Sequence, residues 1–132
     1  MKQSPLLVFE CPAFEVIPGE DEETNPGIYG KSLASWLAER LRSAGVPAGD
    51  VIAEDFGWCI PVGSKPHSLY VACAGTEGEG AEWRVFAFAE GGMFARLRGK
   101  DGRGESLATL FAAVRHCIES APDIRGLREE PT

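Results

Sequence analysis

The amphipathic pattern that follows Pro26 constrains the fold of this chain more than any other feature. Asn25 is a favourable N-cap residue and Pro26 suits the first helical position, so a helix is predicted to begin there. Gly45 predicts its end. At about 100° per residue the apolar side chains share one broad face, comprising Leu33, Trp36, Leu37, Leu41 and Ala44, with Tyr29 at its edge. A helix of about nineteen residues with one apolar face must bury that face, most simply against a sheet.

Arg40 breaks this pattern because it projects into the apolar sector, beside Trp36 and Tyr29. In one interpretation its aliphatic stem covers apolar surface while its charged head reaches water. In the other, the guanidinium is partly buried and either stacks on Trp36 or pairs with a carboxylate. Glu54 or Asp55 is then the expected partner.

The length and charge of the chain bound its class. The 132 residues fit one domain, residues 1–132, and a hydrophobic content of 44% is typical of a globular protein. The net charge of −7 argues against a nucleic-acid partner, which needs a basic binding surface, and against binding to an anionic membrane. An acidic surface instead favours basic partners.

The N-terminal region and the cysteines predict a cytoplasmic protein. Only four consecutive apolar residues, Leu6–Phe9, follow Lys2, which is too few for a signal peptide. No stretch approaches the roughly twenty apolar residues that a membrane-spanning helix needs. The cysteines form no CxxC pair, so we expect free, buried thiols and neither a structural zinc site nor another cofactor. These cysteines are Cys11, Cys59, Cys73 and Cys117.

Apolar patterns elsewhere predict a sheet and a second helix. Strands are expected at Leu6–Ile17, Asp50–Val62, Ser68–Ala74 and Glu82–Glu90, and the second helix at Glu105–Ala121. Pro12 predicts an edge, a bulge or a break in the first strand, and Gly57 a bulge in the second. Residues 123–132 look like a frayed tail. The order β-α-β-β-β-α predicts an α+β two-layer sandwich, with a mostly antiparallel four-stranded sheet and both helices on one face.

The third and fourth predicted strands carry apolar side chains on both faces. Tyr70, Phe86 and Phe88 fall on one face, opposite Val71, Trp83 and Val85. With both helices on one side of the sheet, the other side exposes aromatic rings, which usually marks a partner surface, a ligand groove or a dimer contact. The alternative is that the segment Gly91–Gly104 folds back over these rings.

The acidic loop, Gly19–Gly27, is a candidate site of another kind. Its consecutive acids could bind a divalent cation, but neighbouring carboxylates splay apart and lack the spacing of a calcium loop. A solvated loop that complements the positive end of the following helix is the favoured interpretation. The acids concerned are Glu20, Asp21, Glu22 and Glu23.

Other candidate catalytic groups are weaker. His116 and Cys117 point about 100° apart on a helix, and His67 could reach Cys59 or Cys73 only through the tertiary fold. The carboxylates in the run Glu54–Trp58 lie beside aromatic residues and could titrate at raised pKa. No second catalytic group accompanies them, and no common catalytic motif is present.

Three runs of the sequence stand out together: GEDEETNPGIYG at Gly19–Gly30, SLASWLAERL at Ser32–Leu41 and EDFGW at Glu54–Trp58. They resemble a family of short bacterial proteins of unknown function. The likeness covers most of the chain and is strongest between residues 14 and 62. It implies a bacterial cytosolic origin and supplies neither an activity nor catalytic residues.

Two functional hypotheses follow. The favoured one is a non-enzymatic binding module, of an immunity, chaperone or adaptor kind, that engages a protein partner or a second copy of itself through the aromatic sheet face and the acidic loop. The alternative is a small enzyme or ligand-binding protein with a pocket between the acidic loop and Trp58. That pocket would use Glu54, Asp55 and Arg40.

Overall fold

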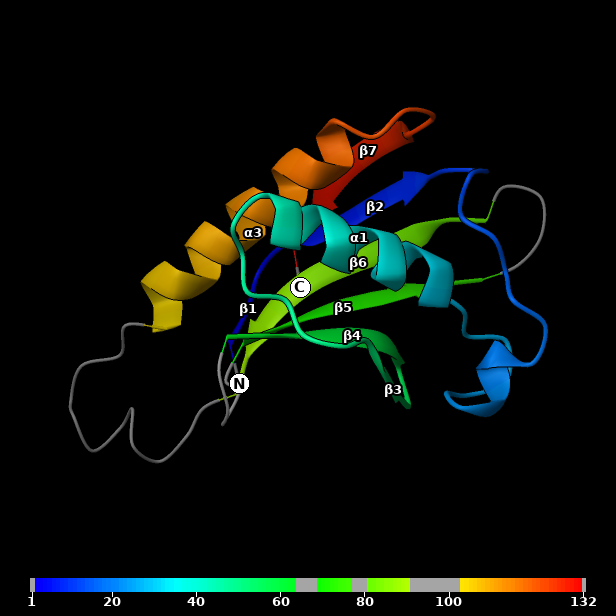
Figure 1. Ribbon diagram of the computed structural model, residues 1–132. Helices are drawn as coiled ribbons and strands as arrows, with labels where there is room; N and C mark the ends of the chain where they lie inside the picture. Colours follow the sequence, from blue (N-terminus) through cyan, green and yellow to red (C-terminus); the bar gives the residue numbers. More distant parts are fainter. Residues whose placement is uncertain (1, 64–68, 77–80, 91–102, 132) are drawn as a thin grey trace.

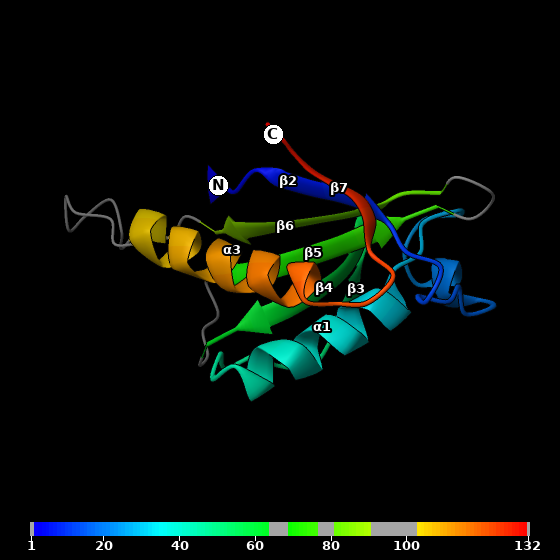
Figure 2. The same ribbon diagram turned by 90° about the horizontal axis from the view of Figure 1, so that it is seen from above.

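One antiparallel sheet with two helices on one of its faces makes up the described part of the chain (Figure 1). The computed structural model describes residues 2–63, 69–76, 81–90 and 103–131. The helices are α1 (Lys31–Ser43) and α3 (Arg103–Glu119), and a short 3-10 helix, η1 (Glu20–Glu22), precedes α1. Seen from above, both long helices lie on the same side of the sheet (Figure 2). The predicted α+β class, with two helices on one face, is confirmed.

The sheet has more strands than the sequence predicts. Its order is β3-β4-β5-β6-β2-β7, and β1 pairs with β6, which gives seven strands within the described residues. All the pairings are antiparallel. The strands are β1 (Lys2–Gln3), β2 (Leu6–Glu10), β3 (Ile52–Glu54), β4 (Gly57–Val62), β5 (Leu69–Gly75), β6 (Trp83–Ala89) and β7 (Arg125–Glu130).

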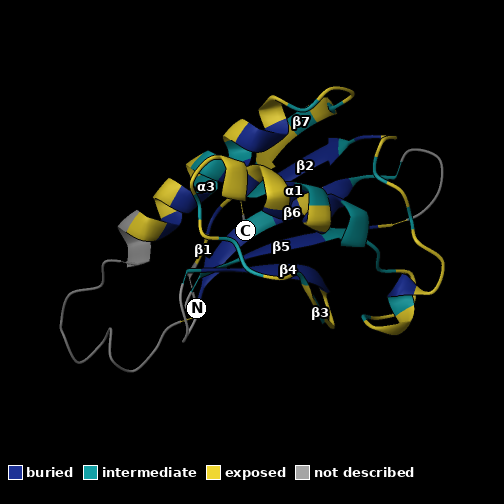
Figure 3. Ribbon diagram, viewed as in Figure 1, coloured by how far each residue is buried: buried dark blue, intermediate teal, exposed yellow. Residues whose placement is uncertain are grey.

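The main core lies between the sheet and the helices. Alternate strand residues point to opposite faces, so Ile60, Val71 and Val85 meet the helices from neighbouring strands. Leu37 and Val114 are contributed by α1 and α3, and all five side chains are fully buried. Figure 3 shows the buried residues concentrated in the strands behind the helices. Burial of this shared apolar surface is the main source of stability.

Helix α1 begins at Lys31, five residues later than Pro26 predicts. The residues before Lys31 form hydrogen bonds with distant parts of the chain instead of a helix. The side-chain amide of Asn25 donates to the carbonyl of Asp55, and Tyr29 exchanges two backbone hydrogen bonds with Gly75. The predicted end of the helix is correct. Gly45 has φ +88° and donates to Arg42, as in a Schellman motif.

The predicted strand Asp50–Val62 is a hairpin. Its first half forms β3 and its second half β4, joined by a turn at Asp55 and Phe56. Gly57 permits this turn because its φ is +148° and a Cβ there would lie 2.5 Å from the carbonyl oxygen of Cys73. A turn replaces the predicted bulge, so Ile52 and Trp58 point to opposite faces of the sheet, contrary to the parity expected for one continuous strand.

The predictions about the ends of the sheet have different outcomes. The first strand stops at Glu10, so the break expected at Pro12 is confirmed, whereas the edge alternative is not, because β2 lies between β6 and β7. The expected frayed tail forms β7, in which Arg128 pairs with Val8. The side chain of Arg128 also donates to Glu82 at 2.8 Å, which ties β7 to the chain beside β6.

All four cysteines are buried and free, as predicted. Among the residues that the structure describes, no helix is long and apolar enough to cross a membrane.

Candidate functional site

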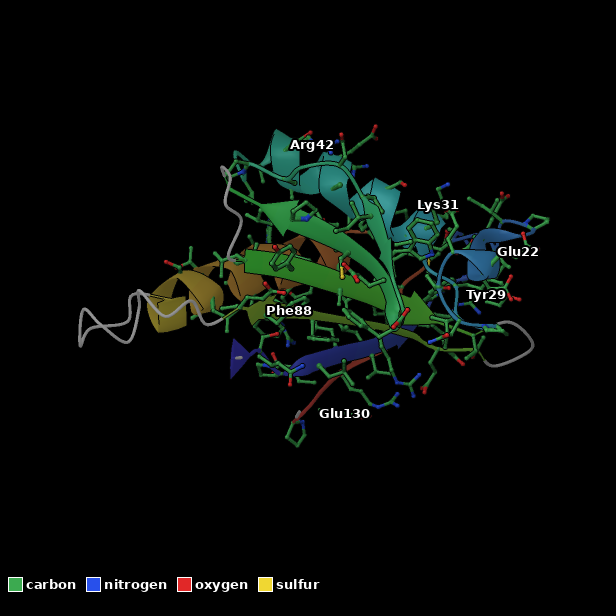
Figure 4. The ribbon with its side chains drawn as sticks, turned by 90° about the horizontal axis from the view of Figure 1, so that it is seen from below. Glu22, Tyr29, Lys31, Arg42, Phe88 and Glu130 are labelled. Carbon is green, nitrogen blue, oxygen red and sulfur yellow. The ribbon has the colours of Figure 1, made fainter. Side chains whose placement is uncertain are left out.

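A groove of about 680 Å³ lies on the sheet face that carries no helix. We call it the sheet groove. Its floor consists of small residues from β4 and β5, and aromatic side chains of β5 and β6 form one wall. The β3–β4 hairpin contributes Ile52 and Phe56. Figure 4 looks onto this face, where Phe88 is labelled.

Strand register explains why this face is hollow. Cys59 in β4 pairs with Ala72 in β5, and Ala72 pairs with Phe86 in β6, so small side chains on two strands adjoin a large one on the third. Residues directly opposite each other share a face of the sheet. In the next row Tyr70 pairs with Phe88. The difference in side-chain size across neighbouring strands leaves space above the floor.

The aromatic wall is a packed cluster. The rings of Tyr70 and Phe88 stack with centroids 5.2 Å apart, and Phe86 lies 5.8 Å from Phe88. Phe56 meets Phe88 edge to face at 6.1 Å. Phe88 is 5% exposed, whereas Phe56 is 47% and Ile52 40% exposed. The structure therefore places Tyr70, Phe86 and Phe88 on the face away from the helices, as their alternation predicts.

The alternative reading, in which the segment Gly91–Gly104 covers these rings, concerns residues 91–102, which lie outside the described part of the chain.

Charged groups line the sheet groove as well. Glu54 and Glu90 are exposed carboxylates on opposite sides of Cys59. Arg84 also lines the groove, and its guanidinium group lies 3.5 Å from the carboxylate of Glu82. Burial, followed by the charges of Glu54 and Glu90, raises the pKa of Cys59 to about 12. The pKa of Tyr70 is raised by the same causes. Because only a thiolate is a competent nucleophile, Cys59 is inert at neutral pH.

Glu20 differs from the other acids of the loop because its side chain is buried. It is 3% exposed, and its carboxylate accepts hydrogen bonds from the backbone N–H groups of Ile17, Gly30 and Lys31 at 2.7, 2.7 and 3.0 Å. Two of these donors belong to the N-terminus of α1, so Glu20 caps the helix from ten residues away. The predicted complementation of the helix end is confirmed for this residue.

The remaining acidic side chains of the loop do not gather into a group that could bind a cation. Asp21 accepts a hydrogen bond from the N–H of Gly27 at 2.9 Å, while Glu22 and Glu23 are exposed. The described residues contain no group of three or more His, Cys, Asp and Glu side chains that could hold a metal ion. Figure 4 shows Glu22 and Tyr29 beyond the end of the sheet, away from Phe88.

In the described part of the chain, the residues expected to line a pocket between the acidic loop and Trp58 lie apart. Glu54 lines the sheet groove and Asp55 is exposed in the hairpin turn, but Trp58 is buried on the helix side. The ammonium group of Lys31 lies 5.1 Å from the Trp58 ring centroid. Within the described residues, the indole N–H of Trp58 has no hydrogen-bond partner.

Arg40 lies on the helix side as well. It is exposed, and its guanidinium carbon is 5.8 Å from the ring centroid of Trp36. This geometry supports the stacking interpretation without burial of the charge. Of the two suggested partners, Glu54 lines the opposite face of the sheet and Asp55 is exposed in the hairpin turn, and neither forms an ion pair with Arg40 within the described residues.

No Cys–His pair forms within the described residues. His116 is exposed on α3, whereas Cys117 is buried, and burial raises the pKa of Cys117 although Arg40 opposes this effect. Burial also raises the pKa of Cys73. His67 lies outside the described residues.

Sequence reasoning missed part of the sheet groove. Ile52, Phe56 and Cys59 line it, but a single continuous strand would direct Ile52 and Phe56 to the face of Trp58. The missed signal was the run Glu54–Gly57, in which two acids precede a glycine that favours a tight turn.

Comparisons with protein-family models, with curated proteins and with solved structures find no match. The resemblance to short bacterial proteins therefore stays a prediction.

Proposed function

We propose that this protein is a non-enzymatic binding module that holds an apolar segment of a partner protein in the sheet groove. The observation that carries the proposal is the apolar groove of about 680 Å³ on a sheet face without helices, at which Phe56 and Ile52 stay 47% and 40% exposed. Exposed apolar side chains gathered at a concave surface typically mark a contact with another molecule.

The chemistry of the groove supports binding rather than catalysis. Its apolar surface exceeds its polar surface, and its one thiol, Cys59, is protonated at neutral pH because its pKa is about 12. Hydrophobic burial of a partner side chain against Phe56 and Phe86 would provide most of the binding free energy. Aromatic residues such as Phe56 and Phe86, once a partner covers them, are typical of the few residues that dominate the binding free energy at an interface.

The acidic loop has a smaller role in this proposal than the sequence suggests. Glu20 and Asp21 hold the backbone around them, which leaves Glu22 and Glu23 as exposed charges. The hydrogen bond from Asn25 to Asp55 ties the loop to the turn that carries Phe56. The loop thus adds negative potential beside one wall of the groove and supports the hairpin.

A peptide-display selection tests the proposal. Peptides selected on the purified protein are expected to be rich in aliphatic and aromatic residues. Phe56→Ser should weaken their affinity at least about tenfold because it removes an exposed anchor from the groove wall. Ile17→Ser is the matched control, since Ile17 is 40% exposed and does not line the groove, and it should leave the affinity unchanged.

Two results would contradict the proposal. One is a selection that enriches no peptide above background. The other is a selected peptide that binds wild type and Phe56→Ser equally well. Light scattering of the same proteins addresses the second-copy alternative: a wild-type dimer that Phe56→Ser dissociates would assign this face to self-association.

A further inference from the structure

We infer that the segment held in the sheet groove is cationic as well as apolar, with a Lys or Arg side chain that lies between Glu54 and Glu90. This inference rests on the proposed function, because it names the chemistry of the partner that the groove would bind. The occupant is a protein segment whose apolar core is flanked by a basic residue.

The two carboxylates reach the groove from different strands. Glu54 ends β3, while Glu90 directly follows β6, and both line the groove. β4 and β5 separate these strands in the sheet order, so the two side chains flank the small-residue floor around Cys59. A cation above that floor would lie between the two carboxylates and would be attracted by both charges.

The electrostatics agree with this arrangement. The charges of both Glu54 and Glu90 act on Cys59, and both act on Tyr70. Both carboxylates therefore contribute negative charge at the floor of the groove. Within the described part of the chain, no ion pair or hydrogen bond engages either carboxylate, so both are available to a partner.

The cation of the groove does not neutralise them. Arg84 lies 3.5 Å from Glu82, which also accepts a hydrogen bond from Arg128 at 2.8 Å. Glu82 thus offsets part of the charge of Arg84. The side-chain charges that act on Cys59 at the floor are those of Glu54 and Glu90, and their sign agrees with the net charge of −7.

The charges that line the groove should therefore decide which apolar segments bind most tightly. Apolar contacts with Phe56 and Phe86 favour any apolar segment, whereas the carboxylates favour a segment with a basic flank and disfavour one with an acidic flank. An aromatic wall that includes Tyr70 adds to this preference, because cations are attracted to the faces of aromatic rings.

Three synthetic peptides test the inference. They share one core of Leu, Phe and Ile and differ at two flanking positions, which are both Lys, both Gln or both Glu. Fluorescence anisotropy gives each affinity for the wild-type protein at low and at moderate salt. The Lys-flanked peptide should bind about five- to tenfold more tightly than the Gln-flanked peptide, as expected for two partly exposed charge pairs, and added salt should reduce this difference.

Charge-neutral variants locate the effect. E54Q/E90Q should bind the Lys- and Gln-flanked peptides with affinities within about twofold of each other. The control E39Q/E119Q removes two charges from the helices on the other side of the sheet and should keep the full preference.

The outcomes separate the two proposals. If none of the peptides binds, the proposed function and this inference both fail. If the peptides bind equally well, or if E54Q/E90Q keeps the preference for Lys, the groove still binds apolar segments but the inference is overturned. Tighter binding of the Glu-flanked peptide would overturn it too and would assign recognition to Arg84.

Discussion

Neighbouring acids of the same loop occupy different environments in this protein. Glu20 is buried and accepts three backbone hydrogen bonds, whereas Glu22 and Glu23 face water. A buried carboxylate is tolerated only when donors replace the lost water, and here the N-terminus of α1 provides two of them. At the scale of the residue, the position of an acid relative to the end of a helix decides whether its carboxylate is buried and stabilises the fold or remains in water.

Replacement of Glu20 should therefore destabilise the fold. Glu20→Ala is expected to lower the free energy of unfolding by about 2–4 kcal/mol, because three N–H donors lose their acceptor. Glu22→Ala should change it by less than about 0.5 kcal/mol, as for most exposed positions. Urea denaturation monitored by tryptophan fluorescence measures both values, and equal stabilities of the two variants would refute this role for Glu20.

The buried thiols predict how stability depends on pH. Burial raises the pKa of Cys59 to about 12 and raises that of Cys73, while an unfolded thiol titrates near about 8.5. Above that pH the unfolded chain loses these protons first. Stability is therefore fully present below about pH 8.5 and falls as the pH rises toward the folded pKa, with a slope of about 1.4 kcal/mol per pH unit for each thiol.

Urea midpoints under reducing conditions between pH 7.5 and 10.5 measure this slope. Cys59→Ala should show a shallower decline than wild type, by about 1 kcal/mol per pH unit above pH 9. The comparison uses slopes rather than absolute stabilities, since the substitution also changes packing. Parallel declines in the two proteins would show that the Cys59 thiol is not responsible.

At the scale of the element, the β3–β4 hairpin creates the sheet groove. Its turn brings Ile52 and Phe56 to the groove while Trp58 packs under α1. Gly57 makes the turn possible, since it combines a φ of +148° with close approach to the carbonyl of Cys73. The turn thus links the backbone geometry of one residue to the shape of the candidate site.

Gly57→Ala should disrupt this hairpin. We expect a loss of about 3 kcal/mol or more, because the new Cβ would clash with the carbonyl oxygen of Cys73 and the backbone would be strained. Gly45→Ala is the control: its φ is +88°, but a Cβ there meets nothing within 4 Å, so about 1–2 kcal/mol is expected. Thermal unfolding compares them, and an equal loss in both would exclude the steric contribution.

Elements with a strong local pattern could be predicted from the sequence. The second helix, β5 and β6 have regular apolar periodicity, and Tyr70, Phe86 and Phe88 lie on the face that their alternation predicts. The start of α1 was wrong because its cap, Glu20, acts from a distance that cap preferences do not consider. Local signals identify elements but not contacts between distant parts of the chain.

β7 illustrates the same limit. Its residues, Arg125–Glu130, are mostly charged and exposed, so they show no apolar alternation. They form a strand because β2 offers an unpaired edge and because Arg128 and Glu129 find partners on other elements. The contribution of the hairpin to the sheet groove is not predicted for a comparable reason, since the turn at Asp55 decides which face Phe56 occupies.

At the scale of the whole molecule, the charged strand β7 covers the apolar strand β2 at one edge of the sheet. Charged residues are a common means of making an edge strand unattractive to other chains, and β7 is rich in them. Without β7, the apolar strand β2 would become the edge.

Deletion of residues 123–132 should therefore lower stability and cause association. We expect a loss of more than about 2 kcal/mol, because the β2–β7 hydrogen bonds and the packing of Leu127 disappear. Light scattering should show oligomers that wild type lacks at the same concentration. Deletion of residues 131–132 alone is the control and should behave as wild type. A monomeric deletion variant of unchanged stability would contradict the role of β7.

The position of β2 has a consequence for synthesis on the ribosome. β2 is translated early, yet its neighbours in the sheet are β6 and β7, which are translated much later. The β3–β4–β5 segment can pair locally as it emerges, whereas Leu6–Phe9 must wait for residues 83–89 and then for residues 125–130. The nascent chain therefore carries an apolar strand without its partners at least while residues 11–82 are synthesised, and this is the interval in which a chaperone would be of most use to it.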